Sequence, residues 1–131
     1  MGAKVAPIVA KRFGKCLLEL GGNNAVIVTP SANLDVALPS ILFGAIGTAG
    51  QRCTSTRRAF VHSSIYDTVF NHLKNVYEGL GNKIGNPLEM GTLVGPLIDK
   101  NAFKNMQDTL KAVKKVGGEV FGGERMITEN K

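Results

Sequence analysis

A chain of 131 residues, of which 44% are hydrophobic and 20% charged, has the size and composition of one globular domain or of part of a larger one. Its net charge of +6 is spread along the chain with no basic block and no interleaved aromatic residues, which argues against a nucleic-acid partner. The two cysteines, Cys16 and Cys53, have no metal-ligand spacing, so we expect no metal site. No apolar run is long enough for a membrane span or a signal peptide, so we expect no membrane partner.

Predicted strands and helices alternate along the chain, because β-branched apolar runs and apolar residues at helical spacing follow one another between Gly, Pro and Asn clusters. In chain order, we expect a helix over 2–14, a buried strand over 16–20, a strand over 25–28, a helix over 36–46, a strand over 58–62, a helix over 65–78, a helix from about 101 to 116, and a short strand over 119–121. This order predicts an α/β fold with a mostly parallel sheet flanked by helices. Because Cys16 lies in the predicted buried strand over 16–20, we expect it to be a core thiol.

Polar residues supply caps for the predicted helices. Asn33 or Asp35 would cap the helix over 36–46, which places Pro39 in its first turn. Asp99 or Asn101 would start the last helix. The sequence begins and ends without a closing element, so we expect it to be an internal piece of a larger α/β protein.

Glu19 stands at the predicted end of an apolar strand, directly before Leu20, Gly21 and Gly22. A carboxylate that is partly withdrawn from water is suited to general-base chemistry, and glycines beside it let a flat ligand approach the backbone. The alternative is a glutamate at a strand end that faces solvent before a glycine turn.

Cys53 lies in a loop of small residues and follows Arg52, with Arg57 and Arg58 shortly after it. Nearby positive charge favours the thiolate form of a cysteine, small neighbours leave room for a substrate carbonyl, and the backbone N–H of Cys53 could hold an oxyanion. The alternative is a buried, inert cysteine.

Two segments together resemble the signature motifs of the aldehyde dehydrogenase superfamily, and the spacing between Glu19 and Cys53 also suits that family. The segments are Leu18-Glu19-Leu20-Gly21-Gly22-Asn23-Asn24 and Gly47-Thr48-Ala49-Gly50-Gln51-Arg52-Cys53-Thr54.

Finer details resemble the antiquitin branch of that superfamily, the α-aminoadipic semialdehyde dehydrogenases. These details are Asn23-Asn24, Gln51-Arg52-Cys53, Arg57-Arg58, and the downstream Gly85-Asn86-Pro87 and Gly95-Pro96-Leu97. The resemblance covers essentially the whole chain. It implies a partial aldehyde dehydrogenase fold, with residues 1–22 as the tail end of the NAD-binding domain and residues 23–131 as the N-terminal part of the catalytic domain.

The resemblance also implies roles. Cys53 would attack the aldehyde, and a thioester would form once NAD (or NADP) has accepted the hydride. Glu19 would activate the water that hydrolyses the thioester, and Glu19, Leu20 and Gly21 would contact the nicotinamide end of the cofactor. Arg52, with Gln51 beside it, would contact a charged tail of a small-molecule aldehyde. Arg52 could instead tune the thiol or pair with a carboxylate.

The sequence lacks other parts of the family's machinery, namely the glycine turn for the pyrophosphate, the oxyanion asparagine, the downstream glutamate for the ribose, and the strand that forms the oligomer, which we expect to be a homotetramer. We therefore expect the 131-residue chain alone not to oxidise aldehydes. A cofactor-free cysteine hydrolase of esters or thioesters, or a non-catalytic truncated fragment, are the alternatives. A reducing compartment is expected, with the cytoplasm as the first choice and the mitochondrion if a targeting segment precedes the chain.

Overall fold

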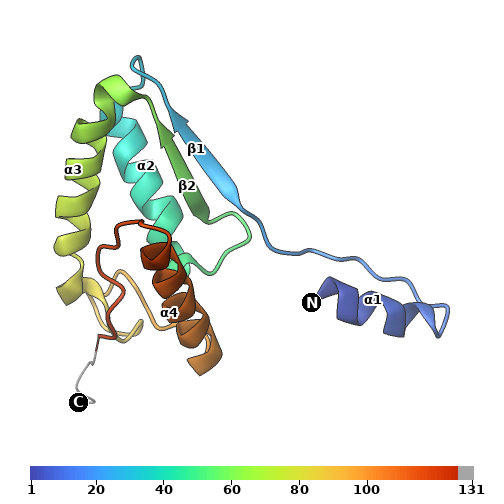
Figure 1. The fold of residues 1–131 in the computed structure, drawn as a ribbon. Helices are drawn as coiled ribbons and strands as arrows, with labels where there is room; N and C mark the ends of the chain where they lie inside the picture. Colours follow the sequence, from blue (N-terminus) through green and yellow to red (C-terminus); the bar gives the residue numbers. More distant parts are fainter. Residues whose placement is uncertain (127–131) are drawn as a thin grey trace.

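The computed structural model describes residues 1–126, in which helices and strands alternate (Figure 1). The predicted α/β class is confirmed. The elements are α1 (Gly2–Ala10), β1 (Asn24–Val28), α2 (Leu34–Ile46), β2 (Thr56–Val61), α3 (Tyr66–Glu78) and α4 (Lys100–Lys115), with short 3₁₀ turns at Gly47–Gly50, Ser63–Ile65 and Gly81–Lys83.

The sheet of the described residues consists of β1 and β2, which pair in parallel with α2 as the crossover between them. Asn24 lies opposite Thr56 and Val28 lies opposite Val61, with one irregularity in register directly after Asn24. Parallel strands joined through a helix place the start of both strands at the same end of the sheet. The segments that precede β1 and β2 therefore meet, and these are the segments that contain Glu19 and Cys53.

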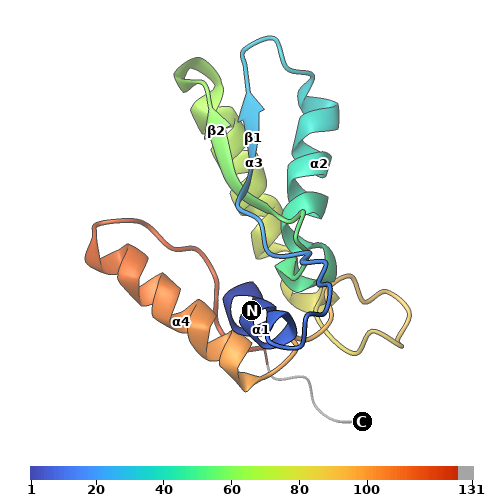
Figure 2. The ribbon, with the colours of Figure 1, turned by 90° about the vertical axis from the view of Figure 1, so that its right-hand side faces the viewer.

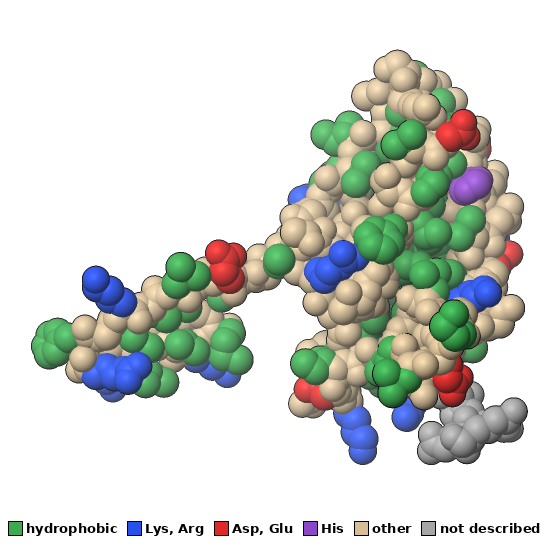
Figure 3. Space-filling view, turned by 180° about the vertical axis from the view of Figure 1, so that it is seen from behind, with side chains coloured by type: hydrophobic (Ala, Val, Ile, Leu, Met, Phe, Trp, Pro, Cys, Tyr) green, Lys and Arg blue, Asp and Glu red, His purple; other side chains and the backbone are tan. Residues whose placement is uncertain are grey.

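One face of the sheet forms the core. Val28, Leu38, Ile41 and Val69 are buried together, which brings β1, α2 and α3 into one apolar cluster, and Figure 1 shows both helices on the same side of the strands. Figure 2 gives the view from the open side of the sheet. Because side chains alternate along a strand, the other face of the sheet is left open, and Ile27 there is 75% exposed. Hydrophobic side chains are visible over much of the surface in Figure 3.

The ends of the helices follow their capping residues. Asn33 rather than Asp35 caps α2, because its side-chain oxygen accepts a hydrogen bond from the N–H of Asp35 at 3.0 Å. The helix consequently begins two residues earlier than predicted, and Pro39 lies in its second turn instead of its first. Asp99 rather than Asn101 caps α4, accepting a hydrogen bond from the N–H of Ala102.

The prediction for the first twenty residues is partly wrong. The helix ends at Ala10, and residues 16–20 form no strand. Within residues 1–126, no backbone hydrogen bond joins residues 15–21 to another segment, so this apolar run has no strand to pair with. Its side chains fold back along α1 instead, since a Cβ at Gly2 would meet the Leu20 side chain at 3.0 Å.

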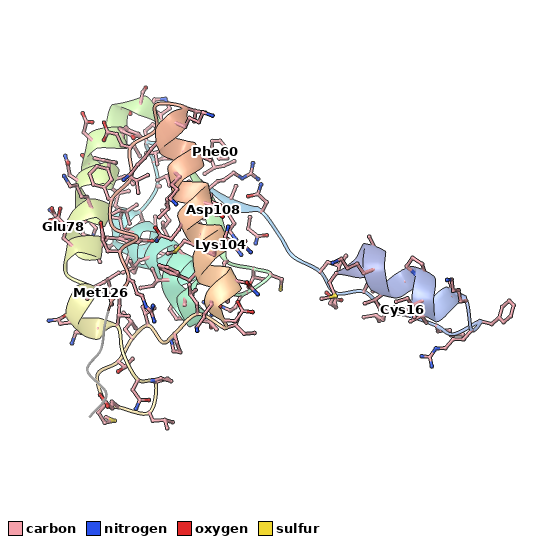
Figure 4. The ribbon with its side chains drawn as sticks, turned by 60° about the horizontal axis from the view of Figure 1, so that its bottom comes forward. Cys16, Phe60, Glu78, Lys104, Asp108 and Met126 are labelled. Carbon is pink, nitrogen blue, oxygen red and sulfur yellow. The ribbon has the colours of Figure 1, made fainter. Side chains whose placement is uncertain are left out.

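Residues 1–23, which we call the N-terminal arm, extend away from the rest of the chain, as Figures 1 and 4 show. Cys16 lies beside α1 in this arm and is exposed, so it is not the core thiol that the sequence predicted. The division of the chain into two domains near residue 22 stays a prediction.

The expected strand over 119–121 is also wrong, because no strand partner lies beside it in the described part of the chain. Phe121 packs edge-on against Phe70 of α3, with the ring centroids 5.6 Å apart, and under the ammonium of Lys74. The last residues of the prediction, 127–131, lie outside the described residues. No helix within residues 1–126 has both the length and the apolar character needed to cross a membrane.

Candidate functional site

Cys53 lies in a tight turn, residues 52–55, that leads into β2 and that we call the cysteine turn. The N–H of Ser55 donates to the carbonyl of Arg52 at 3.1 Å, and the N–H of Arg52 donates to the hydroxyl of Ser55 at 3.1 Å. Ser55 is almost fully buried, whereas Cys53 is exposed. The turn therefore has an anchored base and presents its cysteine to solvent, so Cys53 is not buried as the alternative interpretation expected.

The loop before this turn has an unusual backbone. Thr48 and Ala49 have φ angles of 55° and 53°, and Gly50 has a φ of 70°. A left-handed conformation costs a non-glycine residue about 1–2 kcal/mol, so other contacts must hold this loop in place. The left-handed residues end α2 at Ile46, in agreement with the predicted break, and redirect the chain toward Cys53.

Gln51 supplies one of these contacts. Its amide nitrogen donates to the carbonyls of Thr48 at 3.2 Å and Pro96 at 3.4 Å, and its amide oxygen accepts a hydrogen bond from the N–H of Ile98 at 2.8 Å. The side chain thus ties the strained loop to residues 96–98, which overlap the segment Gly95-Pro96-Leu97 that the sequence singled out. Substrate contact by Gln51 stays a prediction, and its amide is already engaged by its own chain.

Arg52 supplies a second contact, with α2. Its guanidinium donates to the carbonyl of Phe43 at 3.3 Å and lies 5.0 Å from the centroid of the Phe43 ring. A Cβ at Gly47 would overlap the guanidinium, which would then have to move. The Nε atom is buried and has no hydrogen-bond partner within residues 1–126.

A cavity of about 290 Å³ borders this guanidinium. It is mostly apolar, and its lining residues are Pro39, Leu42, Phe43, Ile46, Gly47, Thr48, Arg52 and Leu93. Among the described residues no carboxylate pairs with Arg52, because the only ion pair they contain is that of Lys104 with Asp108. The pairing with a carboxylate that the sequence left open is therefore not seen there.

Asn24 holds the other side of the cysteine turn. Its amide nitrogen donates to the carbonyl of Cys53 at 2.6 Å and to the carbonyl of Ser55 at 3.1 Å. Two residues earlier, a Cβ at Gly22 would overlap the carbonyl oxygen of Cys53. The segment that contains Glu19 is thus in van der Waals contact with the turn that contains the cysteine.

Glu19 itself is exposed in the N-terminal arm. The expectation of a partly buried carboxylate at a strand end is wrong, because no strand forms there. Three residues of extended chain span at most about 11 Å, so Glu19 cannot lie farther than that from Gly22 and its contact with the turn. The structure therefore brings the two signature segments together through Gly22 and Asn24, without a hydrogen bond between Glu19 and Cys53.

The residues expected to contact a cofactor are accessible. Leu20 is 51% exposed, and no atom of another residue lies within 4 Å of a Cβ placed on Gly21. The backbone groups of residues 19–21 make no hydrogen bonds within the described chain. Open space beside a glycine, next to an exposed leucine, fits the approach of a flat ring such as nicotinamide. No group of three or more His, Cys, Asp or Glu side chains within residues 1–126 is placed to hold a metal ion.

Sequence reasoning missed two residues that shape the site, the anchor Ser55 and the amide of Asn24. Asn24 was noticed only as a marker of the antiquitin branch. A signal for its role was present in principle, because an asparagine at the start of one parallel strand lies at the same end of the sheet as the residues that enter the next strand.

Comparisons with known proteins agree with these motifs. The model of the family described as "Aldehyde dehydrogenase family" matches residues 1–131. Aldehyde dehydrogenase family 7 member A1 from Malus domestica is 50% identical over 127 residues, covering 97% of this chain and 25% of the relative. Alpha-aminoadipic semialdehyde dehydrogenase from Rattus norvegicus is also 50% identical, over 96% of this chain and 23% of its own length.

Solved structures show the same similarity in three dimensions. The NAD⁺ complex of an aldehyde dehydrogenase from Bacillus cereus superimposes with a TM-score of 0.89 at 30% sequence identity, covering 98% of this chain and 26% of that one. Succinate-semialdehyde dehydrogenase from Burkholderia pseudomallei gives a TM-score of 0.84 at 33% identity. The chain spans about a quarter of the length of the relatives it matches.

Proposed function

Because this chain belongs to the aldehyde dehydrogenase family, we propose that it carries the reacting residues of an enzyme that oxidises an aldehyde to a carboxylic acid. The observation that carries the proposal is the geometry of the cysteine turn. Cys53 is exposed while the carbonyls around it are held by Asn24. Within residues 1–126 the backbone N–H of Cys53 donates no hydrogen bond, so it is available to a ligand.

These features support a nucleophilic role for Cys53. The thiolate adds to the aldehyde carbon and forms a thiohemiacetal, and the Cys53 N–H donates a hydrogen bond to the oxygen on which negative charge develops. Bound NAD, or NADP, would accept the hydride and so supply the oxidation that leaves a thioester on Cys53. The exposed residues Glu19, Leu20 and Gly21 are those that would contact its nicotinamide end.

Glu19 would act on the thioester as general base. Its carboxylate takes a proton from a water molecule, the water oxygen adds to the thioester carbonyl, and the Cys53 thiolate leaves with the acid as product. The exposure of Glu19, on an arm that touches the cysteine turn at Gly22, supports this role.

For the substrate, we propose a semialdehyde with a charged tail, α-aminoadipic semialdehyde being the first candidate. The support is the 50% identity to the rat protein of that name, together with Arg52 beside the nucleophile. In this structure the guanidinium faces Phe43 and a largely apolar cavity. One nitrogen of the guanidinium is engaged by the Phe43 carbonyl, and within residues 1–126 its other N–H donors remain for a substrate carboxylate.

The chain itself permits a test of the acyl-transfer half of this chemistry. We would incubate it with p-nitrophenyl acetate and locate the acetyl group by peptide mass spectrometry. Acetylation of Cys53 should be at least tenfold faster than that of Cys16, which is an exposed thiol outside the turn and serves as internal control. Glu19→Gln should lengthen the lifetime of the acetyl-cysteine at least tenfold, in line with a general base. Equal acetylation of both cysteines would contradict the assignment of Cys53.

A chimera separates oxidation from cofactor-free hydrolysis. Residues 1–131 would replace the matching quarter of the rat enzyme, and NADH formation would be followed at 340 nm with α-aminoadipic semialdehyde. We expect NADH formation that Cys53→Ser abolishes. Ester hydrolysis that persists in a soluble, folded chimera without any NADH formation would favour the hydrolase instead.

A further inference from the structure

The two adjacent asparagines, Asn23 and Asn24, differ in what their side chains do. Both hydrogens of the Asn24 amide are used, one on the carbonyl of Cys53 and one on the carbonyl of Ser55. The Asn23 side chain is exposed and makes no hydrogen bond within residues 1–126, although its backbone carbonyl accepts one from Arg58 at 2.7 Å.

The asymmetry follows from the sheet. Asn24 is the first residue of β1 and lies opposite Thr56, and the register shifts directly after it. The Asn24 amide lies at the entrance to β2, where it reaches two carbonyls of the cysteine turn, those of Cys53 and Ser55. A planar NH₂ group with two donors can satisfy both carbonyls at once, and a serine or an aspartate at this position could not.

Resting on the function proposed above, we propose that Asn24 is the positioning residue for the nucleophile: its amide fixes the peptide planes that follow Cys53 and Ser55 and thereby sets the direction of the Cys53 thiol. The amide acts through the backbone and does not touch the substrate. Within the described chain, these two bonds are the side-chain hydrogen bonds that join the start of β1 to the cysteine turn.

The test compares the rates at which Cys53 and Cys16 of the same molecule react with iodoacetamide at pH 7, measured by peptide mass spectrometry. Cys16 lies in the N-terminal arm, away from the turn, so the ratio of the two rates cancels differences in reagent and exposure time. The ratio in urea gives the value for a disordered turn. We expect the native ratio to differ from the urea ratio at least fivefold, and Asn24→Ala to move it at least halfway toward the urea value. Asn23→Ala should leave it unchanged.

Asn24→Asp adds a readout that a merely structural role would not produce. An ionised carboxylate cannot donate to the two carbonyls, whereas a protonated carboxyl can donate to one of them. With a dipyridyl disulfide as thiol reagent, the Cys53 to Cys16 ratio of Asn24→Asp should therefore show an additional inflection in the range of a carboxyl group, at about pH 4–6. Wild type and Asn23→Asp should lack this inflection.

The proposal is overturned if Asn24→Ala and Asn23→Ala give the same ratio in folded protein, if the native ratio equals the urea ratio, or if Asn24→Asp shows no added inflection. Circular dichroism identifies a variant that fails to fold. If Asn24→Ala does not fold, the pH dependence of the ratio in Asn24→Asp tests the proposal in its place. If Cys53 is acetylated normally in the Asn24 variants, the positioning role of Asn24 is wrong and the proposed function of Cys53 stands. If wild-type Cys53 is never acetylated, the proposed function fails, and the iodoacetamide ratio still tests positioning.

Discussion

Replacing Gly22 by alanine tests whether the N-terminal arm and the cysteine turn are packed as closely as the structure shows. The new Cβ would overlap the carbonyl oxygen of Cys53 and would stand 3.0–3.2 Å from the side-chain atoms of Asn24. Gly22 does not have a positive φ, so the substitution causes no backbone strain of its own and its effect arises from this contact.

The loss of stability in Gly22→Ala depends on whether the contact is overpacked or the arm moves away. Overpacking of a close contact costs about 1–3 kcal/mol, and if the arm moves away instead, the two hydrogen bonds of Asn24 are lost at about 0.5–1.5 kcal/mol each. A gain of about 0.4–1 kcal/mol from the less flexible unfolded chain offsets part of this. We expect a net loss of roughly 1–2 kcal/mol in the free energy of unfolding, which lowers Tm by about 4–8 °C for a chain of this size.

Gly21→Ala is the matched control, because no atom of another residue lies within 4 Å of a Cβ at that position. Without cofactor, it should be neutral or slightly stabilising in urea unfolding followed by circular dichroism, and it should leave the reactivity of Cys53 toward iodoacetamide unchanged. Gly22→Ala should change both. Equal stability and equal Cys53 reactivity in the two variants would refute the contact between the arm and the turn.

Three further predictions concern the rest of the fold. Asn33→Ala removes the cap of α2 and should cost about 1 kcal/mol in urea unfolding. Val69→Ala should cost about 2 kcal/mol because Val69 is 1% exposed, whereas Val36→Ala, at a position 62% exposed, should change stability by less than about 0.5 kcal/mol. The hydrogen bond from Lys104 lowers the pKa of Asp108 below its ordinary 3.8, so the stabilisation it provides is present above that pH and is lost as pH falls through the folded-state value; NMR titration should show a low midpoint that rises in Lys104→Met.

The helices and strands of the main body were predictable because each has a local pattern. Examples are the apolar spacing of α3, the cap at Asp99 and the β-branched residues of β1. Each of these patterns lies within a short stretch of its own element. The run over 16–20 has an equally good strand pattern and forms no strand. Whether an extended segment becomes a strand depends on a partner elsewhere, and local periodicity carries no information about that partner.

The same limit applies to the candidate site. The sequence pointed to Glu19 and Cys53 through their motifs, and the exposure of Cys53 agrees with a reactive role. The links from Asn24 to Cys53 and Ser55 join residues 29 and 31 positions apart and depend on the register of β1 against β2. Nothing in the adjacent pair Asn23-Asn24 reveals which of the two amides reaches the turn.

The left-handed backbone at Thr48 and Ala49 stores conformational energy directly before the cysteine turn. The two residues together hold about 2–4 kcal/mol of conformational energy, and right-handed angles over 48–50 would release it by adding a turn to the end of α2. The local preference of this segment is thus a right-handed continuation of α2, and the hydrogen bonds from Gln51 to residues 96–98 hold the left-handed turn against it.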